Sequence, residues 1–284
     1  MTPFSLRPRP TASFLAALGT LVCASVDLPA QRLEYFGSVQ VATGDYLFSA
    51  RTSSVYFANG IAVTGGRWRG SVSVPIVAQD AGWVQYSGGV VIPSGGMHGG
   101  DTRRGGEGRG GMMPTQDNAG HGEMGLGDPI VRADFDLVQT GGGRALLRLT
   151  SAIKAPVAKV ATGFGTGAWD AGAGLSYSQL LGATFLFGDA TFWKLGDGPD
   201  FRLRDIVTYA VGAGRPLPGR RLAVLASMLG STSFISGVPA PMQVGGGLSY
   251  RSASGRGMSF SSLVGLTRSA PDIAIATGWQ VPLR

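Results

Sequence analysis

Cysteine, histidine and charge are all scarce in this sequence. Its 284 residues include one cysteine, Cys23, and two histidines, and only 14% of the residues are charged. Soluble domains average about 25% charged residues. A single cysteine excludes an internal disulfide, and since Cys23 lies in a segment that we expect to be removed, thiolate metal sites and cysteine nucleophiles are excluded as well.

Long apolar runs are missing from the body of the chain, where no stretch of about 18 apolar residues predicts a membrane helix. One shorter run, at residues 11–26, follows Arg7 and Arg9 and precedes the small residues of "LPA" at 28–30. That order is typical of a secretory signal peptide. We expect residues 1–30 to be cleaved after Ala30, with an N-terminal anchor helix as the alternative.

Glycine, in contrast, is abundant, with 47 residues in the chain. Each glycine costs a helix about 1 kcal/mol relative to alanine, so a mostly helical fold is not expected. The hydrophobic fraction of 44% excludes general disorder. Low charge combined with this hydrophobicity indicates a surface that faces lipid.

Basic residues outnumber acidic ones by 24 to 17, but they are scattered along the chain rather than gathered in a short patch. A short basic patch is the pattern expected of nucleic-acid binding. We therefore expect no nucleic-acid partner.

Beyond residue 30 the chain divides into stretches of about ten residues that alternate apolar and polar side chains, separated by turns rich in Gly, Pro, Asp and Asn. In residues 127–156, for example, Val131 and Phe135 share one face, and Arg132 and Asp134 share the other. The segments begin near Phe36, Ser53, Arg67, Gly127, Arg144, Ala168, Ala183, Phe201, Arg221, Met242, Gly257 and Asp272. They predict an all-β fold, a transmembrane antiparallel up-and-down β-barrel of about 12 strands over residues 31–284. A soluble β-sandwich is the alternative.

The lengths of the connections orient the barrel, although the first, seventh and eleventh connections are short as well. Those after the second, fourth, sixth, eighth and tenth segments are short, whereas the glycine-rich third connection runs over about 81–126. Short turns face the periplasm in such barrels. The long loop contains both histidines, His98 and His121, and several carboxylates, but their spacing matches no known metal-ligand motif. We expect no metal, no cofactor and no enzymatic activity.

Charged side chains on the inner face are the candidate functional residues, because an arginine facing lipid near the midplane costs about 2–4 kcal/mol. The predicted pore-lining residues are Arg132, Asp134, Asp136, Arg144, Arg148, Asp170, Arg202 and Arg204. A closed barrel in which these residues merely pair is the alternative. Aromatic residues near the strand ends predict two girdles at the headgroups, made of Tyr46, Trp68, Trp169, Tyr177, Trp193, Tyr250 and Trp279.

One segment does not fit the alternation. Phe185, Phe187 and Trp193 are expected to face lipid, yet Asp189 has the same parity. Asp189 would therefore lie on the lipid face unless a bulge near Gly188 changes the register.

Several stretches resemble the outer-membrane proteins of the MetA-pathway of phenol degradation family. They are "VQVATGDYLFSARTSSVYF" at 39–57, "GRWRGSVSVPIV" at 66–77, "GLGDPIVRADFDL" at 125–137, "GFGTGAWDAGAGLSYSQLLGATFLFGDATF" at 163–192 and "LRDIVTYAVGAGRPL" at 203–217. The resemblance implies a barrel of twelve or so strands that transports small, hydrophobic molecules across the outer membrane of a Gram-negative-type envelope, in contact with lipid and solutes. The alternative is a non-conducting barrel, or an exported β-sandwich, that binds a partner through the long loop.

Overall fold

A computed structural model describes residues 31–46, 51–80, 84–87, 90–93, 123–140, 144–158, 164–196, 203–219, 221–235 and 237–283. Its strands are β1 (Arg32–Gly44), β2 (Thr52–Gly65), β3 (Trp68–Gln79), β4 (Val84–Ser87), β5 (Val90–Pro93), β6 (Glu123–Leu126), β7 (Ile130–Thr140), β8 (Ala145–Lys154), β9 (Asp170–Leu181), β10 (Thr184–Lys194), β11 (Ile206–Pro216), β12 (Leu222–Ser231), β13 (Met242–Arg251), β14 (Gly257–Gly265) and β15 (Ile273–Pro282). Within these ranges no helix is long and apolar enough to span a membrane.

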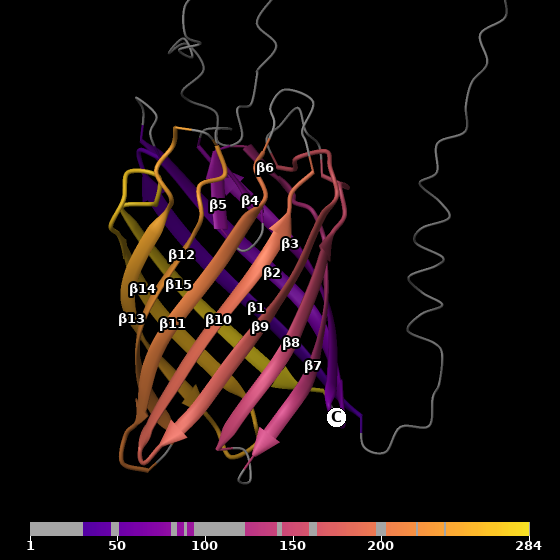
Figure 1. The fold of residues 1–284 in the computed structure, drawn as a ribbon, viewed down its shortest axis with the longest axis vertical. Coiled ribbons are helices and arrows are strands. Elements are labelled where there is room, and N and C mark those ends of the chain that lie inside the picture. Colours follow the sequence, from indigo (N-terminus) through magenta and orange to yellow (C-terminus); the bar gives the residue numbers. More distant parts are fainter. Residues whose placement is uncertain are drawn as a thin grey trace, which may run out of the picture.

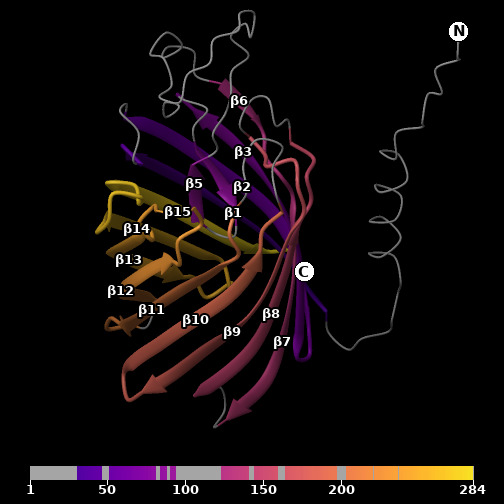
Figure 2. The same ribbon diagram turned by 45° about the horizontal axis from the view of Figure 1, so that its top comes forward.

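Twelve long strands form a closed antiparallel barrel, in which each strand pairs with its neighbours in the chain. The ring closes because β1 pairs both with β2 and with β15, for example Ser38 with Ala58 and with Gly278. The tilted strands and the ring that they form are visible in Figures 1 and 2. The predicted up-and-down barrel of about 12 strands is confirmed, since closure satisfies every strand edge, as lipid requires.

The interruption between β6 and β7 has a local cause in β3. β3 pairs first with β6 and then with β7, and Pro75 lies opposite the break. Proline has no N–H to donate to the ladder. The carbonyl of Pro75 instead accepts a hydrogen bond from the Gly127 N–H, at 2.9 Å.

Side chains alternate between lipid and lumen along each barrel strand, because paired residues of an antiparallel ladder lie on the same face. The outward positions carry large exposed apolar residues such as Ile61, Ile153, Val264 and Ile275. This outer face extends around the barrel wall, so the apolar surface that low charge predicts is present.

β10 is the exception to the sequence prediction. Trp193 pairs with Gly172, and its ring lies where a Cβ on Gly172 would be. Phe185, Phe187 and Asp189 share this inward parity, while Ala190 and Phe192 face out and are exposed. The prediction that the two phenylalanines face lipid is wrong, and Asp189 faces the lumen without a bulge.

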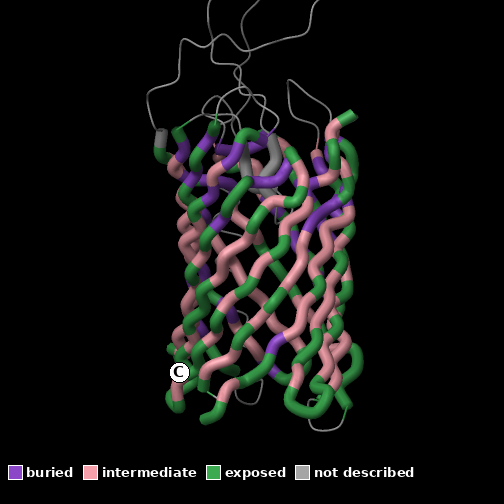
Figure 3. The backbone as a smooth tube through the Cα atoms, turned by 90° about the vertical axis from the view of Figure 1, so that its left-hand side faces the viewer, coloured by how far each residue is buried: buried purple, intermediate pink, exposed green. Residues whose placement is uncertain are grey.

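The two ends of the barrel differ in burial. β1 begins and β15 ends at the end that carries the short turns, which is also the end marked C in Figure 1. Buried residues gather at the opposite end, where β1, β3, β8 and β10 finish (Figure 3). We call this the outer end.

Tyr46 is fully buried at the outer end, just after β1, with a positive φ of 45°. Burial raises the pKa of its phenol to about 12, and the carboxylates of Asp272 and Asp80 add to the shift, while the nearby Ser54 hydroxyl opposes it. As the pH rises above about 10, the unfolded chain therefore loses its phenol proton before the folded chain does, and stability falls between about pH 10 and 12.

Tyr46→Phe is expected to lose less stability than the native chain between about pH 10 and 12, since it removes the phenol whose titration causes the loss. Denaturant unfolding at pH 9, 10 and 11 measures the difference, and the exposed Tyr250→Phe is the matched control. Parallel pH profiles for the native chain and Tyr46→Phe would contradict the role of Tyr46.

Candidate pore and its outer end

One wall of the lumen is charged. β3, β7 and β8 direct both signs inward, with the side chains of Arg69, Arg132, Asp134, Asp136 and Arg148. Arg148 Nε donates to Asp136 Oδ1 at 2.6 Å, and Arg69 lies 3.3 Å from the carboxylate of Glu34 on β1. The Gln280 amide donates to the same Glu34 carboxylate at 2.7 Å. These contacts fix several charged groups close to the wall.

The opposite wall is small and neutral. Among the described residues of β11–β15, the inward positions are filled mainly by Gly, Ala and Ser, and the sole inward charge is Arg251, at the turn end of β13. Gly245 illustrates the close packing, because a Cβ there would lie 2.0 Å from the Ser262 carbonyl oxygen. Small side chains leave lumen space on this side of the barrel.

A hollow of about 390 Å³ opens from the lumen between β8, β9, β10 and β12. Its lining combines two phenylalanines, Phe185 and Phe187, with Arg148, Asp189, Ser176 and Ser178. The two rings stack with centroids 5.7 Å apart and an interplanar angle of 27°. The wall is thus amphipathic at this point, with an aromatic surface beside a carboxylate.

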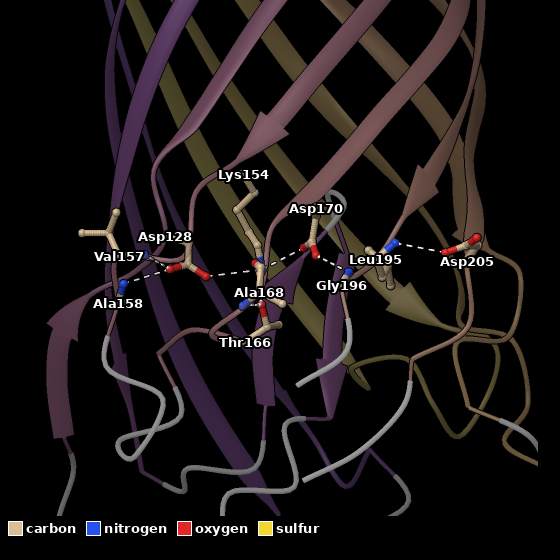
Figure 4. Close-up of polar contacts among 10 residues, drawn as sticks. All are labelled: Asp128, Lys154, Val157, Ala158, Thr166, Ala168, Asp170, Leu195, Gly196 and Asp205. Atoms are coloured by element: carbon tan, nitrogen blue, oxygen red, sulfur yellow. Dashed lines mark hydrogen bonds and ion pairs between the residues drawn. The ribbon is translucent and has the colours of Figure 1, made fainter. Parts of the chain in front are cut away.

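A buried ionic cluster ties the outer connections to the strand ends (Figure 4). Lys154 Nζ lies 2.8 Å from Asp170 Oδ2 and 3.3 Å from Asp128 Oδ2, and it donates to Thr166 Oγ1 at 2.7 Å. All four side chains belong to buried residues. A buried charge is tolerated only when it is paired and hydrogen-bonded, so this cluster holds β8, β9 and their connection together.

The two carboxylates of the cluster also accept hydrogen bonds from backbone N–H groups of the connections. Asp128 Oδ1 accepts hydrogen bonds from the N–H groups of Val157 and Ala158, each at 2.9 Å. Asp170 Oδ1 accepts from the Gly196 N–H at 3.0 Å, which joins the β10–β11 connection to the same point. Beside the cluster lies an apolar group made of Ala152, Trp193, Leu195, Leu203, Ile206 and Phe234. Polar and apolar contacts together make the outer end the best-packed part of the barrel.

The predicted pore-lining residues are placed as follows. Arg132, Asp134, Asp136, Arg148 and Asp170 face inward, on β7, β8 and β9. Arg144 is exposed in the turn before β8, and Arg204 is exposed at the outer end, where its N–H donates to the Phe234 carbonyl. Arg202 lies outside the described residues. That these residues line a conducting pore stays a prediction.

The predicted girdle residues divide into two groups. Trp68, Tyr177, Tyr250 and Trp279 lie on outward positions toward the turn end, and Trp169 is half exposed at the outer end. Tyr46 and Trp193 are buried, with exposed fractions of 0% and 3%, so their assignment to the outer girdle is wrong. Trp193 points inward into the apolar group beside β11, where burial of its large ring stabilises the outer end.

Sequence reasoning missed the partners of Lys154 and the lumenal position of Phe185 and Phe187. Asp128 and Thr166 come from connections rather than strands, so no alternation points to them. The phenylalanines carried a usable signal, because Phe187 pairs with the inward Ser178 of β9 and Phe185 lies on the same face of β10 as Phe187.

Comparison with known proteins shows a shared fold but no relationship in sequence. No protein-family model matches the sequence, and no curated protein matches it either. The COG4313 outer membrane channel from Pseudomonas putida F1 superposes with a TM-score of 0.61 at 11% identity, over 90% of this chain and 97% of that one.

Two further outer-membrane proteins superpose too loosely to carry an argument. The CymD monoaromatic hydrocarbon channel has a TM-score of 0.45 at 11% identity, over 90% of this chain and 89% of that one. The P. putida toluene transporter TodX has a TM-score of 0.42 at 10% identity, over 90% of this chain and 91% of that one. Likeness at such low identity concerns architecture alone. This chain shares its fold with barrels of the bacterial outer membrane.

Proposed function

We propose that the mature chain is an outer-membrane channel of a Gram-negative-type envelope that lets small molecules pass passively through its lumen. The observation that carries the proposal is the closed ring of strands, apolar outside and lined with Arg, Asp, Ser and Gly inside. A barrel with this division belongs in lipid, and a polar interior is the kind found in water-filled outer-membrane channels. The shared fold with a channel supports the proposal.

The proposal includes residues 1–30, which lie outside the described residues, and the connection at about 81–126, which is described only at 84–87, 90–93 and 123–126. Residues 1–30 act as a signal peptide that is removed, and the connection at about 81–126 forms a long outer loop. The family of the MetA-pathway of phenol degradation is the group in which we place the chain, on the stretches quoted above. The partners of the mature chain are outer-membrane lipid and small solutes.

Planar-bilayer recording on the refolded mature chain tests the proposal. Steady openings of reproducible size in KCl are expected after insertion, because the charged wall attracts water and ions into the lumen. Heat-modifiable gel migration verifies that the inserted protein is the folded barrel. Many verified insertions without current would overturn the channel.

A second candidate, a non-conducting barrel that binds a partner, is favoured by the packed outer end. The ionic cluster around Lys154 and the apolar group around Trp193 occupy the entrance region of the barrel. The same recordings separate the two candidates, since a folded barrel that never conducts supports the second.

A further inference from the structure

The hollow beside β10 contains a carboxylate with no partner of its own. Among the described residues Asp189 has neither a hydrogen bond nor an ion pair, whereas Arg148 in the same hollow is already bound by Asp136 at 2.6 Å. A half-buried carboxylate that faces a cavity retains the capacity to accept hydrogen bonds from a ligand. The available charge in the hollow is therefore negative.

The apolar side of the hollow is built firmly. The ring of Phe187 packs against β11, where a Cβ on Gly212 would come within 2.3 Å of the ring atom Cζ. Phe185 stacks beside it, and Leu146 and Leu225 continue the apolar surface. Because Gly212 leaves the space that the ring occupies, the aromatic surface is held in place on β10 rather than free in the lumen.

Aromatic rings next to an unpaired carboxylate match one class of ligand. A flat ring stacks on phenylalanine, and an ammonium group is attracted both by a carboxylate and by the face of an aromatic ring. We propose that this hollow, with Asp189, Phe185 and Phe187, is a lumenal binding site for aromatic ammonium ions such as protonated arylalkylamines. The proposal rests on the proposed function and names the class of solute that the channel retains.

Arg132 on β7 is the group that opposes this assignment. It faces the lumen and acts on Asp189 through space without forming an ion pair. If Arg132 dominated, the hollow would take aromatic anions instead. The volume of about 390 Å³ accepts a single-ring ligand of either charge, so charge alone decides.

The test compares three probes that share one ring, namely benzylammonium, benzoate and benzyl alcohol. Titration calorimetry on the refolded barrel in detergent micelles, with empty micelles subtracted, is expected to rank benzylammonium first. Asp189→Asn is expected to weaken benzylammonium about tenfold and to leave benzyl alcohol unchanged, as the loss of a charged hydrogen bond predicts. Phe187→Leu is expected to weaken both of these probes, since both use the ring surface.

Asp272→Asn is the matched control, because it removes an exposed carboxylate at the outer end, where Asp272 pairs with Arg51. Benzoate bound as tightly as benzylammonium, or an unchanged benzylammonium affinity in Asp189→Asn, would overturn the site. Selective binding by a barrel that never conducts would refute the channel and keep the site. Conductance without selective binding would support the channel and refute the site.

Discussion

Lys154→Met is expected to lower the free energy of unfolding of the barrel by about 3–5 kcal/mol. The substitution keeps the length of the side chain and removes the cation that lies between Asp128 and Asp170. Both carboxylates belong to residues that are at most 4% exposed, so each would remain buried without its counter-charge. Denaturant unfolding from lipid vesicles, followed by tryptophan fluorescence, measures the loss.

Lys194→Met is the matched control, since Lys194 is an exposed residue at the end of β10. It is expected to change stability by no more than about 0.5 kcal/mol. A triple variant with Asp128→Asn, Lys154→Met and Asp170→Asn is expected to recover much of the loss, because the uncompensated charge disappears. Equal stability of Lys154→Met and the native chain would mean that water already screens the cluster.

The same cluster connects stability to conduction. Asp128 and Asp170 hold backbone N–H groups of the β8–β9 and β10–β11 connections. Loosening these connections opens the best-packed end of the barrel, so Lys154→Met is also expected to pass more current per insertion than the native chain. Lower or unchanged current in the variant would place the constriction elsewhere.

The strands were predictable because their signal is local. Along β13 and β14, Leu248 and Phe260 face out while Gly247 and Ser261 face in, and each pattern can be read from one segment alone. Because lipid-facing side chains must be apolar and successive side chains of a strand face opposite sides, apolar residues recur at every second position of the sequence.

β10 was mispredicted because both of its faces are apolar. Phe185, Phe187 and Trp193 compete with Leu186, Ala190 and Phe192, and hydrophobicity alone does not choose between the sets. The choice is made by the hairpin with β9, where the two-residue turn at Gly182 pairs Phe187 with the inward Ser178. Register from a neighbouring strand therefore decides the face, and the sequence interpretation had taken the turn as longer.

The ionic cluster was beyond prediction for a different reason. Asp170 was expected to face inward, but its partner Lys154 also binds Asp128, which lies before β7, and Thr166, which lies in the connection before β9. Such contacts depend on how the connections fold over the barrel end. No periodicity in the chain records that arrangement.

Ala190→Arg is expected to destabilise the barrel by about 2–4 kcal/mol, the usual cost of an arginine that faces lipid near the midplane. Ala190 lies near the middle of β10, is exposed and pairs with the outward Leu175 of β9. Thr191→Arg, one residue further along, is expected to cost much less, because its side chain enters the lumen, where water and carboxylates solvate a guanidinium. Unfolding from lipid vesicles of defined thickness measures both variants under the same conditions.

The comparison of these two neighbours discriminates between the two interpretations of β10. If Phe185 and Phe187 faced lipid, Thr191 would do so as well, and Thr191→Arg would be the more damaging change. Equal losses would mean that the strand lies too near an interface for lipid to distinguish its faces. A loss confined to Ala190→Arg establishes the inward face of β10, and with it the position of Asp189 in the lumen.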